Sequence, residues 1–228
     1  NTSLRNVNAL LRLTTNLINF ERADTYTSSL YISEYELNAY MTETVNAFRS
    51  YANVKHINLT YETNFRYLNV WLDKDKMDSI LKNLISNALK YTPEGGSVHI
   101  YAGESSDNWC IEVKDTGIGI PASEQKKLFK IHFRGSNAIN SKITGSGIGL
   151  LLVGKLVSIH KGKLSFTSTE GKGSNMKVTF PKAEKYYRKA IQRPPLKGEK
   201  VVYSEAGVPV SISQPDSSIY ENMKQQTL

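Results

Sequence analysis

The chain has 228 residues, a formal net charge of +8, 39% hydrophobic residues and 22% charged residues. This composition supports one sizeable core with flanking segments and excludes a disordered protein. No apolar run reaches the ~18 residues of a membrane span, no signal-peptide layout is present, and the single Cys110 excludes an intramolecular disulfide or a cysteine-based zinc site. We therefore expect a soluble, cytoplasmic chain without direct membrane contact. Its scattered Lys and Arg argue against a nucleic-acid partner.

The first predicted element is an amphipathic helix over residues 3 to 22, within a first segment of residues 1 to 22. Its apolar stripe has helical spacing: Leu4, Val7, Leu11 and Ile18. One helix cannot bury such a stripe alone, so a helical partner is expected, with packing on its own domain as the alternative. Residues 23 to 33 read as a polar connector that ends in a short extended piece.

A larger domain is predicted over residues 34 to 181. It starts with a helix from Glu34 to Ala52, and the alternation of Ile57, Leu59 and Tyr61 then marks a strand. A short strand from Leu68 to Leu72 follows.

A second helix is predicted from the cap Asp73 to about Tyr91, where Thr92-Pro-Glu-Gly-Gly96 ends it. Asn83, Asn87 and Lys90 stand at i, i+4 and i+7 and share one flank of this helix. A ligand is therefore expected along that flank.

The rest of the domain is predicted as a hairpin, a helix and a second hairpin. The hairpin pairs Val98–Ala102 with Trp109–Asp115, the helix runs from Gly147 to about His160, and Lys163–Ser168 pairs with Asn175–Phe180. The fold class is therefore α+β, with the helices and strands in a two-layer α/β sandwich. Residues 182 to 228 are rich in Ser, Pro, Gln and Lys, and read as a basic, largely disordered linker.

Two glycine motifs predict an ATP site. In Asp115-Thr-Gly-Ile-Gly-Ile120, the aspartate can reach an adenine amino group while Gly117 and Gly119 let the backbone approach the base. The second motif opens a helix and offers backbone N–H groups to phosphate; it comprises Gly145, Ser146, Gly147, Ile148, Gly149 and Leu150. Its G-x-G-x-G spacing excludes a Rossmann motif.

The order of these motifs resembles the catalytic, ATP-binding domain of sensor histidine kinases, in the wider family of gyrase, mismatch-repair and heat-shock ATPases. Two more stretches are similar to it. Leu128 to Arg134 looks like the phenylalanine box, with Phe129 and Arg134 matching and His132 departing, and Gly171-Lys-Gly-Ser174 looks like the last glycine box. The resemblance covers residues 1 to 181. It implies the Bergerat ATP-binding fold, preceded by the second helix of a dimerisation hairpin.

The resemblance also implies roles for single residues. An amide oxygen is a hard, neutral ligand suited to Mg²⁺, and Asn87 matches the asparagine that holds this ion in the family. Lys90 and Tyr91 match residues that reach the phosphates and sugar, and Arg134 is expected to stabilise charge on the γ-phosphate. The nucleotide set is completed by Ile120, Phe129, Ser174 and the second glycine motif. Residues 135 to 146 look like the lid over the triphosphate.

Asn83 stands where related ATPases carry a glutamate that activates water. An amide cannot accept a proton at neutral pH, so this position favours phosphoryl transfer over hydrolysis.

The implied function is transfer of the γ-phosphoryl of Mg-ATP to a histidine, for relay to a response-regulator aspartate. The implied partners are an upstream phosphoacceptor helix, a receiver domain, which can lie in the same polypeptide, and a second copy in a membrane-anchored full-length homodimer. None of the four histidines lies in the family's acceptor motif, so the chain alone is not expected to phosphorylate itself. Two alternatives stay open: another enzyme of the superfold, such as an ATP-driven machine or a serine kinase, and a nucleotide-binding scaffold without transfer.

Overall fold

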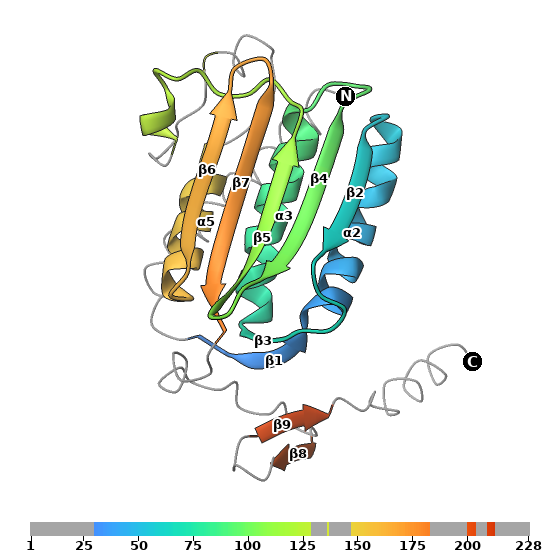
Figure 1. Cartoon of the computed structure of the whole chain (residues 1–228), viewed down its shortest axis with the longest axis vertical. Helices are drawn as coiled ribbons and strands as arrows, with labels where there is room; N and C mark the ends of the chain where they lie inside the picture. The colour runs from blue at the N-terminus through green and yellow to red at the C-terminus, as the bar shows by residue number, and fades with distance from the viewer. Residues whose placement is uncertain (1–29, 129–135, 137–146, 183–199, 204–208, 213–228) are drawn as a thin grey trace, which may run out of the picture. The chain divides into compact units, whose positions relative to one another are not determined.

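The computed structural model describes residues 30–128, 136, 147–182, 200–203 and 209–212. The chain divides into a unit of residues 1–191 and a unit of residues 192–228. The larger unit places a five-stranded sheet against three helices that cover one of its faces (Figure 1). This two-layer α+β arrangement confirms the predicted fold class. No helix in the described ranges has the length and hydropathy of a membrane span.

The first elements are a strand β1 (Ser33–Glu36), a helix α2 (Leu37–Val54), two strands β2 (Asn58–Thr63) and β3 (Asn69–Leu72), and a helix α3 (Lys74–Tyr91). The predicted start of α2 at Glu34 is wrong, because Ser33–Glu36 pairs antiparallel with Asn69–Leu72. The Glu36 carboxylate then caps the helix, accepting hydrogen bonds from Asn38 N at 3.0 Å and Ala39 N at 2.6 Å.

The five-stranded sheet has the order β2-β4-β5-β7-β6. Its remaining elements are β4 (Ser97–Glu104), β5 (Asn108–Asp115), β6 (Lys163–Thr169) and β7 (Gly173–Pro181), with helix α5 (Gly149–Ile159) before β6 and the short η1 (Gln125–Lys127) after β5. Strands β2 and β4 are parallel because α3 forms the crossover between them, and the other pairs are antiparallel. Both predicted hairpins are confirmed, and α5 begins two residues later than predicted.

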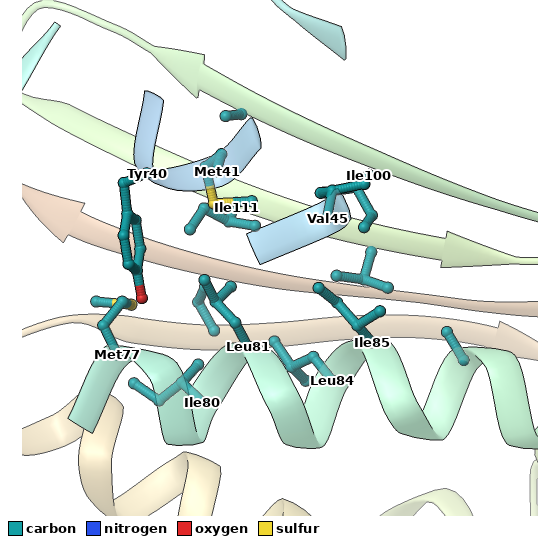
Figure 2. Packing of buried hydrophobic residues seen from close by; sticks show 14 of the residues in the cluster. Tyr40, Met41, Val45, Met77, Ile80, Leu81, Leu84, Ile85, Ile100 and Ile111 are labelled. Carbon is teal, nitrogen blue, oxygen red and sulfur yellow. The ribbon is translucent and has the colours of Figure 1, made fainter. Parts of the chain in front are cut away.

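The core lies between the helices and the inner face of the sheet. Figure 2 shows Met41 and Val45 of α2 and Leu81 and Ile85 of α3 packing beside Ile100 of the sheet. These five side chains are at most 1% exposed. Burial of each contributes about 1.5–3 kcal/mol relative to leaving it in water. The packed core therefore holds α3 rigidly against the strands that end at the candidate site.

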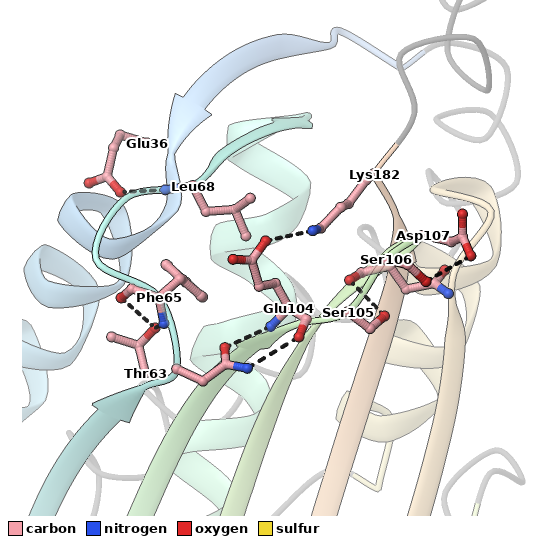
Figure 3. A network of polar contacts seen from close by, with 11 residues as sticks. Glu36, Thr63, Phe65, Leu68, Glu104, Ser105, Ser106, Asp107 and Lys182 are labelled. Carbon is pink, nitrogen blue, oxygen red and sulfur yellow. Dashed lines mark hydrogen bonds and ion pairs between the residues drawn. The ribbon is translucent and has the colours of Figure 1, made fainter.

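The residues just before β1 and just after β7 are both held at the end of the sheet that carries the β4–β5 turn. On the entering side, Tyr31 N donates to the buried Asp73 carboxylate at 2.9 Å. On the leaving side, Lys182 Nζ donates to Glu104 Oε2 at 2.5 Å (Figure 3). The Asn64 side-chain amide holds the Glu104 backbone in turn: its oxygen accepts from Glu104 N at 2.9 Å, and its nitrogen donates to Glu104 O at 3.2 Å.

The smaller unit contains one antiparallel pair, β8 (Lys200–Tyr203) and β9 (Pro209–Ile212). The sequence analysis described residues 182 to 228 as a basic, largely disordered linker and did not predict these two short strands. Both are rich in the β-branched residues that favour strands. The polar composition of the segment as a whole concealed that local preference.

Candidate nucleotide-binding site

The candidate site lies at the end of the sheet where β5 ends and where α3 has its carboxyl terminus (Figure 1). Asp115 is the last residue of β5, and the loop after it turns toward α3. Thr116 N donates to Ser97 O at 3.0 Å, and Ile118 N donates to Tyr91 O at 3.2 Å. The first bond holds the loop to the start of β4, and the second joins the first glycine motif to the end of α3, the helix that carries Asn83 and Asn87.

The Asp115 carboxylate has two chemically different oxygens. Its Oδ1 accepts hydrogen bonds from Gly117 N at 2.8 Å and Ser174 N at 3.2 Å. Within the described ranges, Oδ2 has no hydrogen-bond donor. Burial raises the pKa of this carboxyl, and the two backbone N–H groups partly offset that effect. The side chain is therefore fixed through one oxygen and keeps the other for a ligand donor.

The two glycines of this motif are required by the protein's own packing. A Cβ atom on Gly117 would lie 2.6 Å from Tyr91 O. Gly119 has a φ of +63°, and a Cβ there would overlap Thr169 O. The loop therefore approaches both the end of α3 and the β6–β7 turn closely, which holds its backbone in one place.

Ser168 joins this loop to the last glycine box, and the sequence analysis did not identify it. Its hydroxyl accepts from Ile120 N at 2.9 Å and lies 2.9 Å from the Ser174 hydroxyl. Gln125 adds bonds from its amide to Ile120 O at 3.1 Å and Ser168 O at 3.0 Å. No local pattern marks Ser168 or Gln125, because their role depends on contacts with residues distant in sequence.

The two asparagines of α3 differ in their hydrogen bonding. Asn83 Nδ2 donates to Ser79 O at 2.8 Å, and a Cβ atom on Gly149 would lie 2.6 Å from Asn83 Oδ1. Asn83 therefore lies against the first residue of α5. The Asn87 side chain is half-buried and makes no hydrogen bond with the described part of the chain. The Asn87 amide oxygen remains available as a ligand, whereas the Asn83 amide is held through its nitrogen by Ser79 O.

Lys90 and Tyr91 form a pair at the end of α3. Lys90 Nζ lies 4.6 Å from the centroid of the Tyr91 ring and donates to the Tyr91 hydroxyl at 3.2 Å. Both side chains are half-buried. The pair places one cation beside the glycine loop, where a phosphate group would be attracted.

The start of α5 provides a second binding element. Gly147 has a φ of +72°, and the N-cap residue Ile148 gives no side-chain hydrogen bond to the first turn. Leu150 is half-buried and packs on the core. Backbone N–H groups of a first helical turn that lack a side-chain cap bind anions well. The phosphate contact of Gly149 and its neighbours stays a prediction, which this uncapped first turn would allow.

Four predicted site residues lie outside the described residues: Phe129, Arg134, Gly145 and Ser146. The predicted lid over residues 135 to 146 also lies outside them, except for Ser136. Ser136 N donates to Glu124 Oε2 at 3.0 Å.

A magnesium ion at this site would depend on Asn87. No group of three or more His, Cys, Asp and Glu side chains that could hold a metal occurs in the described ranges. Mg²⁺ commonly keeps several waters and takes other ligands from phosphates, so one protein ligand is compatible with it. The unbonded Asn87 amide fits this requirement.

The sheet, helices α3 and α5, and the Asp115 loop define an ATP-binding domain. Residues 72–184 match the family described as histidine kinase-, DNA gyrase B-, and HSP90-like ATPase. The chain belongs to this family, and its relatives are sensor histidine kinases.

Two curated relatives illustrate the similarity. The sensor histidine kinase WalK of Bacillus subtilis is 33% identical over 177 residues, which cover 77% of this chain and 29% of WalK. The circadian input-output histidine kinase CikA of Thermosynechococcus vestitus is 30% identical over 218 residues, which cover 92% of this chain and 30% of CikA. The chain thus spans less than a third of the length of either relative.

Solved structures agree with this family. The catalytic domain of histidine kinase ThkA has a TM-score of 0.59 and 26% identity, and the match covers 66% of this chain and 97% of that domain. Full-length ShkA in complex with AMPPNP has a TM-score of 0.70 and shares the fold, at 22% identity over 80% of this chain and 38% of ShkA.

Proposed function

We propose that this chain binds Mg-ATP through the described site and supplies the catalytic domain of a two-component sensor histidine kinase. The observation that carries the proposal is the Asp115 carboxylate, which is fixed through Oδ1 and has no hydrogen bond on Oδ2 among the described residues. A carboxylate oxygen can accept a hydrogen bond from the amino group of adenine, whereas guanine presents a carbonyl oxygen at the same position. Recognition of ATP over GTP follows from this difference.

The phosphates would lie between α3 and the start of α5. Lys90 would bind them as a cation, and the first-turn N–H groups of α5 would donate to them. Asn87 would hold a magnesium ion, which when bound neutralises charge on the phosphates. Residues outside the described ranges, Arg134 among them, would complete this part of the site.

The reaction of the whole protein is part of the proposal. A histidine nitrogen of a dimerisation hairpin, to which residues 3 to 22 would belong, attacks the γ-phosphorus, and the bond to the β-phosphate oxygen breaks to release ADP. Catalysis would rest on positioning and charge stabilisation. Asn83 supports transfer rather than hydrolysis, because its amide donates to Ser79 O and cannot take a proton from water.

A response-regulator aspartate would be the next phosphoryl acceptor. The structurally similar histidine kinase ThkA was solved in complex with the response regulator protein TrrA, at 24% identity and a TM-score of 0.59. That complex supports a receiver domain as partner of this chain. A homodimer and a membrane anchor in the full-length protein belong to the same proposal.

Calorimetric titration with a slowly hydrolysed ATP analogue, with and without Mg²⁺, tests the binding step. We expect magnesium-dependent binding and at least about tenfold weaker binding of the matching GTP analogue, because one lost or repelled polar contact costs ~1–3 kcal/mol. A folded chain that binds neither analogue would overturn the proposed function.

A further inference from the structure

The carboxyl-terminal turn of α3 carries Lys90 and Tyr91, and each of its last four carbonyl groups has a donor. Ala88 O accepts from Thr92 N at 3.0 Å and from the Thr92 hydroxyl at 2.7 Å. Tyr91 O accepts from Ile118 N at 3.2 Å. Because the last four carbonyls of a helix have no partner within the helix, the remaining two also need donors from elsewhere.

Lys55 supplies those donors. This residue is the C-cap of α2, and its Nζ donates to Leu89 O at 2.6 Å, to Thr92 O at 3.3 Å and, most weakly, to Lys90 O at 3.5 Å. A cation at this end of a helix also stabilises the negative end of the helix dipole. Burial lowers the pKa of the ammonium, because removal from water disfavours its charged form.

The segment after Lys55 holds the turn that follows α3. Gly95 N donates to His56 O at 3.1 Å, and Asn58 N donates to Gly96 O at 3.0 Å. On the other side of the helix end, Ile118 of the Asp115 loop donates to Tyr91 O. The end of α3 is therefore bonded from two directions, by the α2–β2 connection and by the nucleotide loop.

We propose that Lys55 is a positioning residue for the nucleotide site. Its ammonium holds the last carbonyls of α3, so that Lys90 and Tyr91 keep their place. Through the bond between Tyr91 O and Ile118 N, it also holds the loop that carries Asp115. Without this donor the carbonyl of Leu89 must accept a hydrogen bond from water instead, and the last turn of α3 would open. The inference rests on the proposed nucleotide binding and adds a residue that does not itself reach the ligand.

Replacing Lys55 by Met in the 228-residue chain tests the inference, since Met keeps an unbranched stem and lacks the charge. Lys82→Met is the matched control, because Lys82 is an exposed lysine of α3, the helix whose last carbonyls Lys55 bonds. We expect K55M to bind the ATP analogue about tenfold more weakly than wild type, the effect of losing roughly one charged hydrogen bond, and K82M to bind as wild type does. Lys55→Arg should restore most of the affinity, because a guanidinium also donates to several carbonyls.

A second measurement does not depend on nucleotide. Hydrogen exchange of the Ile118 and Thr92 amides should be about tenfold faster in K55M than in K82M, because both amides donate to carbonyls of the loosened turn. If K55M does not fold, Lys55→Gln replaces it. A variant that has a lower midpoint of unfolding but unchanged exchange at both amides would overturn the inference, and so would unchanged analogue affinity. A wild-type chain that binds no analogue defeats the proposed function alone, and the exchange measurement still decides about Lys55.

Discussion

The Asp115 side chain shows how one residue combines a structural and a binding role. One oxygen holds two backbone N–H groups of the glycine motifs, and the other has no donor in the described part of the chain. In Asp115→Asn the amide can keep the first role, but its NH₂ group would then face the adenine amino group. We expect analogue affinity to fall by about 100-fold, which corresponds to ~2.7 kcal/mol.

The stability of Asp115→Asn should change by less than about 1 kcal/mol, because the variant removes a buried charge while keeping a hydrogen-bond acceptor. Calorimetry and urea denaturation on the same preparations measure the two effects separately. The control is Asp107→Asn in the exposed β4–β5 turn, which should alter neither quantity. Unchanged affinity in Asp115→Asn would contradict the assignment of the adenine contact.

His160 predicts a pH dependence of stability. The ring is 1% exposed, its Nδ1 bonds Leu156 O at 2.8 Å, and its Nε2 accepts from Asp73 N at 3.3 Å, which requires the neutral form. Burial lowers its pKa below 6.5. Between the folded and unfolded pKa values the unfolded chain binds more protons, so stability is complete above about pH 6.5 and is lost as the pH falls.

Urea denaturation at pH 7.5 and at pH 5.5 measures this effect. In His160→Gln the loss of stability between the two conditions should be smaller than in the wild type, because the titrating ring is absent. His56→Gln is the control, since the His56 side chain is 73% exposed. Equal pH dependence in the wild type and His160→Gln would refute the assignment.

At the scale of one element, the amino terminus of α3 depends on a buried ion pair. Asp73 Oδ2 bonds Lys76 Nζ at 2.6 Å and Tyr31 N at 2.9 Å, and both charged side chains are less than 8% exposed. Asp73→Ala would leave the Lys76 ammonium without this partner and remove the helix cap. We expect a loss of about 3–5 kcal/mol in the free energy of unfolding.

Chemical denaturation provides the measurement, and Asp75→Ala, an exposed change in the same first turn, provides the control with an effect below about 1 kcal/mol. A comparable loss in both variants would show that the charge of the first turn matters, rather than the buried pair.

The elements differ in how far the sequence predicts them. Helix α3 was predicted within a residue at each end, because its cap, its apolar face and the Pro93 stop signal all agree. Strand β1 was missed, since Ser33–Glu36 directly precedes the helical pattern of α2. It is extended because β3 pairs with it. Tertiary pairing overrides local preference there.

At the scale of the whole molecule, nucleotide binding should stabilise the larger unit. An analogue at 100 times its dissociation constant adds about 2.7 kcal/mol to the free energy of unfolding. For a domain of this size, that shift raises the midpoint of thermal unfolding by roughly 5–10 °C. Thermal unfolding followed by circular dichroism, with and without Mg²⁺ and analogue, checks the expectation. No shift at saturating analogue would contradict binding to the folded unit.

The candidate site was predictable only where residues carry a motif. Asp115, Asn87 and the glycines were found because their chemistry is tied to fixed spacings along the chain. Ser168, Gln125 and Lys55 were not, because each acts on backbone groups more than thirty residues away in sequence. Only the fold brings such donors and acceptors together. The ligand-binding roles of Asp115, Asn87 and the glycines stay predictions, as do those of Phe129 and Arg134.

The described part of the larger unit begins and ends near the end of the sheet that lies away from the candidate site. Tyr31 and Lys182 are held at one end of the sheet, and Asp115 lies at the other, with α3 running between them (Figure 1). The 18 residues of α3 make this helix ~27 Å long. If the larger unit rotated by ~10° about the end of the sheet near Tyr31 and Lys182, a bound nucleotide would therefore move ~5 Å sideways. Such a distance is enough to bring a γ-phosphate into or out of reach of an acceptor without any change inside the site.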